Sequence, residues 1–483
     1  MNKRIIFYTI KTILSLEMIF LAIPLLISFY YQESWRLKLS YAMTILLIFL
    51  FTKVLPKEKP KDEKVFTKEG FAIVSLSWIF MSLFGALPLC ISGEVPSYID
   101  SVFEIVSGFT TTGATVIPNI EVLSNSLLFW RSFTLFIGGM GMLVLIIAII
   151  PQNSTPSTYI MKAEVPGPVF GKLVSKMSYN SRILYLIYVA LTIILIIALR
   201  MAGMPLFDAI IHAFGTAGTG GFSMKNNSIA YYNNSSIEYI LAIGMLVFGI
   251  NFNMFYFIMM GKFKDFFKNE ELKWYITFIF ASFLLICLNL ASRYNSIKLL
   301  IKDVFFTVSS LITSTAFATI NFGDWPLFSQ IVLLFLIFIG GCAGSTAGGL
   351  KVSRVIILGK IFFRTIKRVT TPNRKMTIQM SGKKITDELQ GSITSYLLVY
   401  IMFFAFLLII LSLEIPDFFS CFSAAAAIFN NAGTGFGIVG PEYNYSGFSY
   451  TSKIIITFFM LLGRLEIFPL LIIFSTSLYK KEK

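Results

Sequence analysis

The chain has 483 residues, of which 56% are hydrophobic and only 13% are charged. An average soluble protein carries about 25% charged residues, so this chain has too little polar surface to cover itself in water. The net charge of +15 does not indicate a nucleic-acid-binding protein, because the basic residues lie between apolar segments and form no single patch. One histidine and four scattered cysteines argue against a zinc or redox site.

Ten long apolar segments follow in chain order, each near the length of about 20 residues that a membrane helix needs. They lie at about 5–30, 38–55, 70–92, 126–150, 182–202, 236–260, 273–292, 326–360, 392–413 and 450–478. Connections rich in lysine and arginine alternate with connections poor in them, as the positive-inside rule requires for an even number of spans. We therefore predict a multi-pass membrane protein with both termini in the cytoplasm.

Four shorter apolar segments lie on the predicted outer side, at about 98–110, 205–215, 301–314 and 416–430. An added crossing at any of them would reverse the charge pattern, so each is expected to enter the membrane and return as a re-entrant helix. The expected fold is all-α, with ten transmembrane helices, four re-entrant pore helices and four pseudo-symmetric span-pore-span repeats around one central pore. The predicted boundaries are 1–66 for two leading helices, then repeats at 67–180, 181–270, 271–385 and 386–483.

Each short segment ends in a cluster of threonine, glycine or other small residues, and the clusters recur at long, similar intervals when aligned on Gly113, Gly220, Ala316 and Gly435. Potassium filters replace the water shell of the ion with rings of backbone carbonyls, and glycine supplies the positive φ that turns these carbonyls. One such cluster would more often be an ordinary turn, but four at equivalent places favour a cation filter. The candidate ion-binding residues are Thr111, Thr112, Gly113, Thr219, Gly220, Gly221, Thr315, Ala316, Phe317, Thr434, Gly435 and Phe436.

Three further runs complete a pattern that resembles a known family. They are Trp130-Arg131-Ser132 leading into Ile137-Gly138-Gly139-Met140-Gly141, the run from Gly340 to Lys351, and Gly463-Arg464-Leu465-Glu466-Ile467-Phe468. Over nearly its whole length the chain is similar to the membrane subunit of Trk-type potassium uptake systems, in the superfamily that includes Ktr and HKT transporters. The resemblance implies K⁺ uptake across a bacterial inner membrane, without enzymatic activity or a cofactor. It also implies a homodimer and a cytoplasmic nucleotide-binding regulatory partner.

A gate is expected in the eighth span, where glycines and small residues run from 340 to 350. Each glycine costs a helix about 1 kcal/mol relative to alanine, so the helix should break there. The resemblance implies a flexible loop that obstructs the pore, while a close helix crossing through small residues is the alternative. The candidate gating residues are Gly340, Gly341, Gly344, Ser345, Thr346, Gly348, Gly349, Lys351 and Arg464.

Charged residues at membrane depth carry further expectations. The resemblance places Arg464 in the pore below the filter, and ion pairing with Glu466 or with another span is the alternative. Asp208 and Asp417 are expected to cap re-entrant helices, whereas Glu104 is expected to hold the filter backbone from behind. The ten basic residues between 351 and 384, with no acidic one, would attract anionic lipid or an acidic partner surface.

Ala316 departs from the family pattern, which has glycine at this position. Positive φ costs a residue with a Cβ about 1 kcal/mol or more, so we expect either a relaxed strand or an incomplete carbonyl ring. A weakly selective K⁺/Na⁺ pathway or a Na⁺-coupled symporter is therefore the alternative function. A transporter with inverted repeats fits less well, because four repeats that each cross twice share one orientation. A membrane enzyme would need a cluster of reactive side chains that we do not find in the sequence.

Overall fold

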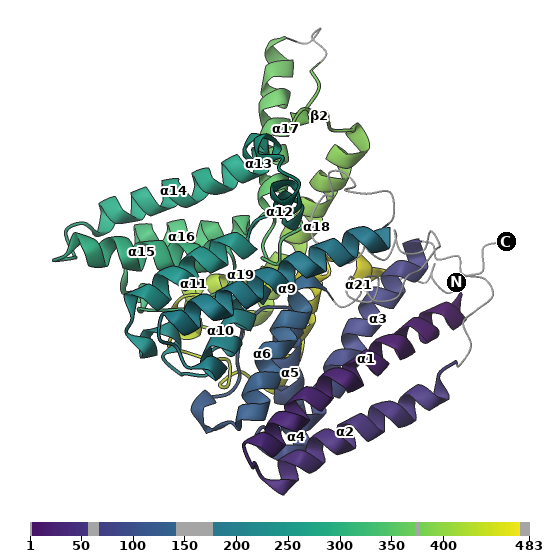
Figure 1. Ribbon diagram of the computed structural model, residues 1–483. Coiled ribbons are helices and arrows are strands. Elements are labelled where there is room, and N and C mark those ends of the chain that lie inside the picture. The colour runs from purple at the N-terminus through teal and green to yellow at the C-terminus, as the bar shows by residue number, and fades with distance from the viewer. Residues whose placement is uncertain (1, 57–66, 142–176, 372–375, 474–483) are drawn as a thin grey trace.

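The computed structural model describes residues 2–56, 67–141, 177–371 and 376–473 of the chain. Its described part is mostly helical, with one short antiparallel hairpin, β1 (Gln379–Met380) and β2 (Lys383–Lys384), in which Gln379 pairs with Lys384 (Figure 1). Most of the basic connection expected between 162 and 182, and the ends of the spans expected at 126–150 and 450–478, lie outside the described residues.

The N-terminal part begins with a pair of long helices that pack side by side, α1 (Lys3–Tyr30) and α2 (Trp35–Val54) (Figure 1). The first group follows, with α3 (Thr67–Gly85), α4 (Leu87–Ser92), α5 (Tyr98–Phe109), the 3-10 turn η1 (Ile120–Val122) and α6 (Asn125–Met140). The second group comprises α9 (Met177–Met201), α10 (Leu206–Gly218), η2 (Ser228–Tyr232), α11 (Ser235–Phe248), α12 (Phe252–Met259) and α13 (Phe263–Lys268).

The third group comprises α14 (Glu270–Leu290), α15 (Ile297–Ile312), η3 (Phe322–Asp324), α16 (Leu327–Ile339) and α17 (Val352–Thr370). Its helices α14, α15 and α16 lie on the side of the bundle away from α1 and α2 (Figure 1). The last group comprises α18 (Asp387–Leu411), α19 (Phe418–Phe429), η4 (Gly437–Val439), α20 (Tyr450–Arg464) and α21 (Phe468–Ile473). The far end of α17 and the hairpin project together from one end of the bundle (Figure 1).

Six helical segments of the described chain are long and apolar enough to cross a membrane. They are Lys3–Tyr30, Trp35–Val54, Lys68–Ser92, Ser181–Met201, Glu270–Leu290 and Asp387–Leu411. The pair α11 and α12 would add a seventh if it were counted as one span, but it is bent by 94°. The protein is therefore a multi-pass membrane protein, and within the described residues fewer than ten helices meet the length and hydropathy of a straight span.

The apolar segments predicted at 236–260 and 450–478 are both interrupted in the structure. α11 stops at Phe248, and α20 stops at Arg464 before two residues with positive φ. The predicted interruption of the eighth span is present between α16 and α17. Close packing accompanies these breaks: a Cβ on Gly463 would lie 2.4 Å from the carbonyl oxygen of Phe429, at the end of α19. α20 therefore ends near the C-terminal end of a short helix.

The short segments predicted from the sequence form α5, α10, α15 and α19, helices of 12 to 16 residues. Asp417 caps α19 as expected, because its carboxylate accepts a hydrogen bond from the Ser420 amide. Asp208 does not cap α10 as expected: the N-cap is Pro205, and the Asp208 carboxylate, in the first turn, instead accepts a hydrogen bond from the Tyr232 hydroxyl at 2.6 Å.

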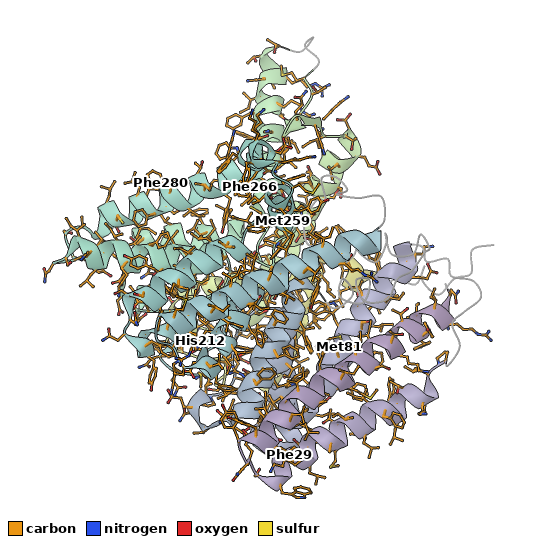
Figure 2. The ribbon with its side chains drawn as sticks, viewed as in Figure 1. Phe29, Met81, His212, Met259, Phe266 and Phe280 are labelled. Carbon is orange, nitrogen blue, oxygen red and sulfur yellow. The ribbon has the colours of Figure 1, made fainter. Side chains whose placement is uncertain are left out.

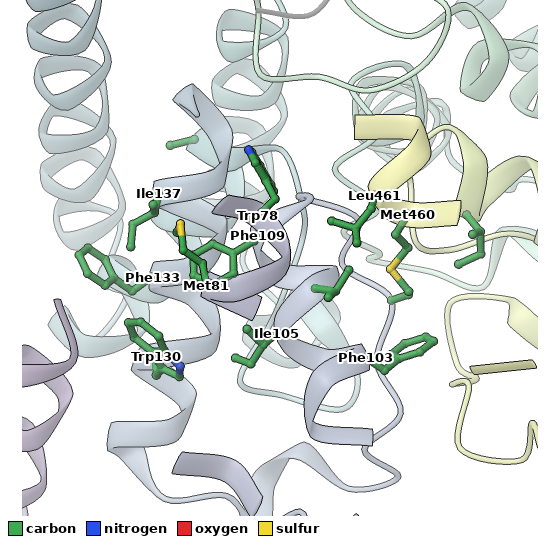
Figure 3. Packing of buried hydrophobic residues seen from close by; sticks show 14 of the residues in the cluster. Trp78, Met81, Phe103, Ile105, Phe109, Trp130, Phe133, Ile137, Met460 and Leu461 are labelled. Carbon is green, nitrogen blue, oxygen red and sulfur yellow. The ribbon is translucent and has the colours of Figure 1, made fainter. Parts of the chain in front are cut away.

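The short helices are buried among the longer ones. Figure 3 shows side chains of α5, α6 and α20 meeting in one apolar cluster, with Trp130 and Phe109 in edge contact. The indole of Trp130 also donates a hydrogen bond to the Gly85 carbonyl at 2.9 Å. Figure 2 shows the contrast with Phe280, which lies on an outer face of α14 and is 64% exposed. Apolar side chains thus cover both the interior and the outer faces, as a membrane protein requires.

Candidate functional site

The loops that follow the four short helices share one backbone conformation. We name them loop 1 (110–116), loop 2 (218–223), loop 3 (313–318) and loop 4 (430–436). Each has two residues with positive φ, separated by one residue. The first of the two is Thr111, Thr219, Ser314 or Asn431, with φ between 52° and 55°. The second is Gly113, Gly221, Ala316 or Gly433, with φ between 60° and 77°.

The same hydrogen bonds hold each loop to its helix. In every loop the second positive-φ residue and the residue before it donate their amides to one carbonyl in the last turn of the short helix. The accepting residues are Ser107, Gly215, Ser310 and Ala427. This shared pattern defines which positions are equivalent.

The alignment on Gly220 and Gly435 was wrong by one and two residues. The structural equivalents of Gly113 are Gly221, Ala316 and Gly433. The hydrogen bonds to the end of the short helix fix the position of the turn, whereas the position of a Thr-Gly pair in the sequence does not. Gly433 was therefore missing from the candidate residues, although it precedes Thr434 directly.

Two predicted candidates have backbone groups that point toward their own helix. Phe436 exchanges two hydrogen bonds with the Ser423 hydroxyl, at 3.0 and 3.1 Å. The carbonyl of Phe317 accepts a hydrogen bond from the Ser310 hydroxyl at 2.7 Å. These residues lie just past the turn and brace it from the helix side.

The loops lie edge to edge. A Cβ on Gly113 would lie only 1.6 Å from the carbonyl oxygen of Gly220, in the neighbouring loop. A Cβ on Gly221 would lie 1.8 Å from the Thr315 oxygen, and one on Gly433 would lie 2.2 Å from the Thr112 oxygen. Loop 4 therefore adjoins loop 1, loop 1 adjoins loop 2, and loop 2 adjoins loop 3, with backbone oxygens at each junction.

Ala316 keeps the conformation of the three equivalent glycines, with a φ of 60°. Loop 3 therefore keeps the usual geometry. Of the two outcomes expected for alanine at this position, a relaxed backbone does not occur. An L-residue in this region costs about 1 kcal/mol or more, which the hydrogen bonds of loop 3 must offset.

Glu104 holds loop 1 from behind, as the sequence predicts. Its carboxylate accepts hydrogen bonds from the Val116 amide at 3.1 Å and from the Thr115 hydroxyl at 3.0 and 3.1 Å. It also pairs with Arg131, whose Nε lies 2.7 Å away, and both side chains are fully buried. The Arg131 guanidinium lies over the Phe222 ring of loop 2 at 4.1 Å. Sequence reasoning gave Arg131 no role, although an arginine within an apolar span signals a buried partner.

Polar side chains also fix the other loops. The Asn431 amide donates to the Thr112 hydroxyl at 2.9 Å, which joins loop 4 to loop 1. His212 of α10 lies inside the bundle and contacts the Ser223 hydroxyl at 3.0 Å (Figure 2). The Tyr445 hydroxyl donates to the Gly433 carbonyl at 3.0 Å. None of these three braces was predicted, because each joins residues that are separated in sequence.

The predicted gating residues other than Arg464 form one irregular segment, which we name the glycine loop (340–351). It contacts the ends of the short helices directly: the Gly348 amide donates to the Ser314 hydroxyl at 2.6 Å, and the Gly349 amide donates to the Asn430 carbonyl at 3.1 Å. A Cβ on Gly348 would lie 2.0 Å from that carbonyl oxygen, so only glycine fits there. The glycine loop therefore lies against loops 3 and 4.

Arg464 connects the glycine loop to α6. Its guanidinium donates to the Thr346 carbonyl at 2.8 Å and to the Gly138 and Gly139 carbonyls at 2.6 and 2.8 Å. Glu466 was the wrong partner: it pairs with Arg354 of α17, with Nη1 and Oε1 3.1 Å apart. Residues two apart on a helix face different directions, and the helix ends between them.

A small cavity lies between the glycine loop, α18 and α20. Its lining includes Lys351, Arg464, Glu466, Asn430 and Asn431. Lys351 is buried, has a φ of 77° and donates a hydrogen bond to the Ala347 carbonyl. Lysine, arginine and glutamate side chains thus line a cavity directly beside loop 4.

The sequence of this chain matches a family of known proteins. The family model TrkH, described as cation transport protein, matches residues 40–481. The chain belongs to the TrkH family. The Trk system potassium uptake protein TrkH of Escherichia coli (strain K12) is 36% identical over 433 residues, covering 88% of this chain and 89% of the relative.

Other TrkH-family proteins match over almost the entire chain. The Trk system potassium uptake protein TrkH of Vibrio parahaemolyticus is 33% identical, covering 99% of this chain and 100% of the relative. The crystal structure of the potassium transporter TrkH from Vibrio parahaemolyticus matches with a TM-score of 0.89 at 31% identity, covering 99% of this chain and 100% of that chain. The TrkH family is one of transporters and not of enzymes, and it indicates no cofactor.

Proposed function

We propose that this protein takes up K⁺ through one pore whose selectivity filter is formed by loops 1 to 4. The observation that carries the proposal is the shared conformation of the four loops, with backbone oxygens at the junctions between neighbours. Positive φ at alternate residues changes the direction of successive carbonyls, and rings of carbonyls replace the water shell of K⁺ in potassium filters. The names of the TrkH-family relatives, which are potassium uptake proteins, support K⁺ as the transported ion.

The proposed ion-binding groups are backbone carbonyls near the two positive-φ residues of each loop. We keep Thr111, Thr112, Gly113, Thr219, Gly220, Gly221, Thr315 and Ala316, and we add Asn431, Ala432 and Gly433 from the corrected alignment. Thr434, Gly435, Phe436 and Phe317 lie further along their loops, at the edge of the proposed filter.

The proposed architecture has ten transmembrane helices, with α5, α10, α15 and α19 as re-entrant pore helices in four pseudo-symmetric repeats. We place the boundaries at 1–66, 67–180, 181–270, 271–385 and 386–483. The protein would lie in the inner membrane of a bacterial cell with both termini in the cytoplasm, as the alternation of basic connections favours. The membrane potential would then draw K⁺ inward with about 2.3 kcal/mol per charge per 100 mV.

The glycine loop is the proposed gate, and Arg464 helps to hold it. The predicted gating residues between 340 and 351 lie together there, Arg464 donates to the Thr346 carbonyl from α20, and hydrogen bonds from Gly348 and Gly349 reach loops 3 and 4. A homodimer, a cytoplasmic nucleotide-binding regulatory subunit and anionic lipid at the basic segment between 351 and 384 are the proposed partners. The names of the relatives, which are Trk system proteins, support association with other components.

A weakly selective K⁺/Na⁺ pathway is the second candidate function, and Ala316 favours it. The three glycines at this position each face a carbonyl of the next loop with no room for a Cβ. Loop 4 faces loop 1, loop 1 faces loop 2 and loop 2 faces loop 3, so the next junction in this order would join loop 3 to loop 4. The methyl group of Ala316 would then point toward loop 4 and hold these two loops further apart. A wider junction would weaken contact with a dehydrated K⁺ and admit other ions. Na⁺-coupled symport is a further form of this alternative.

The test is cation flux into proteoliposomes, comparing Rb⁺, K⁺ and Na⁺ for the wild-type protein and for Ala316→Gly. We expect strong preference for K⁺ and Rb⁺ over Na⁺ in the wild type, with little change on substitution, because loop 3 already has the required φ. Comparable Na⁺ flux that Ala316→Gly reduces would instead establish the weakly selective pathway. If no cation enters even with the regulatory partner present, the protein is not a pore.

A further inference from the structure

The first turn of α14 carries two adjacent carboxylates that contact different parts of the molecule. Asn269 caps this helix by accepting a hydrogen bond from the Leu272 amide at 2.9 Å. Glu270 and Glu271 come next, and neither belongs to the proposed filter or gate. Consecutive residues on a helix point about 100° apart. One helix end can therefore contact two separate elements.

Glu271 contacts the glycine loop. Its side chain is 4% exposed, and its Oε1 accepts a hydrogen bond from the Ala343 amide at 2.7 Å. The same oxygen accepts a second one from the Ser353 amide at 3.2 Å. Ala343 lies within the glycine loop and Ser353 lies just after it, in the first turn of α17. One carboxylate thus joins both sides of the loop.

Glu270 contacts the elements that project from the bundle. Its backbone amide donates to the Ser381 hydroxyl and its carboxylate accepts from the Ser381 amide, both at 3.1 Å. It also pairs with Lys360 of α17, and Lys360 donates to the Gln379 carbonyl at 2.7 Å. Gln379 is in β1, and Ser381 is in the turn between the two strands. Figure 1 shows this hairpin beside α17.

We propose that Glu271 is a positioning residue for the glycine loop, and that the first turn of α14 couples the hairpin β1–β2 to this loop. Displacing the hairpin would pull on Glu270, and the rigid first turn would carry that displacement to Glu271 and to the loop. Hydrogen bonds to a charged acceptor are roughly twice as strong as neutral ones, so loss of this charge loosens the loop. The proposal rests on the proposed function in so far as the glycine loop obstructs the pore.

Cys342 gives a direct measure of the loop position. It precedes Ala343, is 1% exposed, and is one of four cysteines in the chain. Replacing Cys90, Cys287 and Cys421 leaves Cys342 as the single reactive thiol. A parallel chain that retains only Cys421, which is buried on α19 and 2% exposed, reports on general loosening of the fold.

The experiment measures the rate of N-ethylmaleimide labelling in native membranes for Glu271→Gln, Glu270→Gln and Glu388→Gln. Glu388 is the matched control, because it is an exposed carboxylate in the first turn of another long helix, α18. We expect Glu271→Gln to raise Cys342 labelling roughly tenfold, since about 1.4 kcal/mol is a factor of ten. Glu270→Gln should raise it about threefold, as a partly exposed ion pair contributes less. Cys421 labelling should not change.

The coupling is overturned if Cys342 is labelled no faster in Glu271→Gln or in Glu270→Gln than in Glu388→Gln. A matching rise in Cys421 labelling also overturns it, because the effect would then be general destabilisation. Labelling needs no ion movement, so this result is separate from the proposed function. Rb⁺ flux measured on Glu271→Gln completes the test: faster labelling without faster flux would support the coupling and reject the glycine loop as the obstruction.

Discussion

At the scale of single residues, Gly113 and Ala316 have equivalent backbones but different surroundings. Both have positive φ, which favours glycine at either position. Gly113 also lies against a backbone oxygen of loop 2, and a backbone atom cannot move aside as a flexible side chain can. The glycine at 113 is therefore required by packing as well as by conformation.

We expect Gly113→Ala to abolish Rb⁺ uptake. Its Cβ would overlap the Gly220 oxygen, and forcing extra atoms into a packed site costs about 1–3 kcal/mol in addition to the strain of positive φ. Gly359→Ala is the control, because a Cβ there meets nothing within 4 Å. Uptake and thermal unfolding of both purified variants check this. Wild-type uptake by Gly113→Ala would contradict the packing of loops 1 and 2.

The glycines were predictable in kind but not in position. Small residues at the ends of the short apolar segments identified all four loops from sequence. The sequence alignment did not identify which residues of the four loops are equivalent, because it matched one Thr-Gly pair with another. In the structure, the hydrogen bonds to the preceding helix decide where each turn lies. The contacts of Arg131 and Asn431 were beyond sequence reasoning, since their partners Glu104 and Thr112 lie 27 and 319 residues away.

At the scale of helices and loops, the breaks in α11–α12 and α20–α21 are the main departure from the predicted spans. Hydropathy predicts where a segment is apolar, and these segments are apolar throughout. It carries no information about the tertiary contacts at a break, such as Gly463 against the Phe429 carbonyl. The interruption at the glycine loop was predictable because five glycines there each weaken a helix.

We expect Arg464→Gln to raise Rb⁺ flux roughly tenfold in the absence of a regulatory partner, because hydrogen bonds to a charged donor contribute about 1.5–3 kcal/mol each. The substitution removes the fixed charge and weakens the tie between the glycine loop and α6. Arg200→Gln is the matched control, as Arg200 is an exposed arginine in the last turn of α9. Unchanged or lower flux in Arg464→Gln would show that Arg464 does not restrain conduction.

The junction of α18 and α20 should depend on pH through Glu414. Partial burial raises the pKa of Glu414, but hydrogen bonds from the Ser449 and Ser452 hydroxyls outweigh it and leave the pKa below its usual value. A carboxyl group with a lowered pKa stabilises the fold above its unfolded pKa, and this contribution is lost as the pH falls through the folded pKa. The melting temperature of Glu414→Gln should therefore lie below that of the wild type at neutral pH.

Acidification below the folded pKa should bring the two melting temperatures together, because Glu414 is then protonated. Thermal unfolding of both proteins between neutral pH and acid provides the measurement. A constant difference at all pH values would mean that the Glu414 charge plays no part.

At the scale of the whole molecule, the orientation of the chain can be tested directly. The basic connections predict that both termini face the cytoplasm. We expect green fluorescent protein fused after the C-terminus to fluoresce, and alkaline phosphatase fused there to be inactive. Alkaline phosphatase inserted after Gly447, where a Cβ meets nothing within 4 Å, should be active, because this loop lies on the predicted outer side. The reverse pattern would invert the proposed topology and the direction of the pore.

The hydrogen bonds of Arg464 have a consequence for how such a pathway could be controlled. A guanidinium does not lose its proton at any physiological pH, so acid or alkali cannot remove this positive charge. Its donors engage carbonyls of both the glycine loop and α6, so the charge cannot shift without breaking contacts on two sides. If the glycine loop is the gate, moving this charge therefore requires the surrounding backbone to move, and a change of pH alone would leave the charge in place.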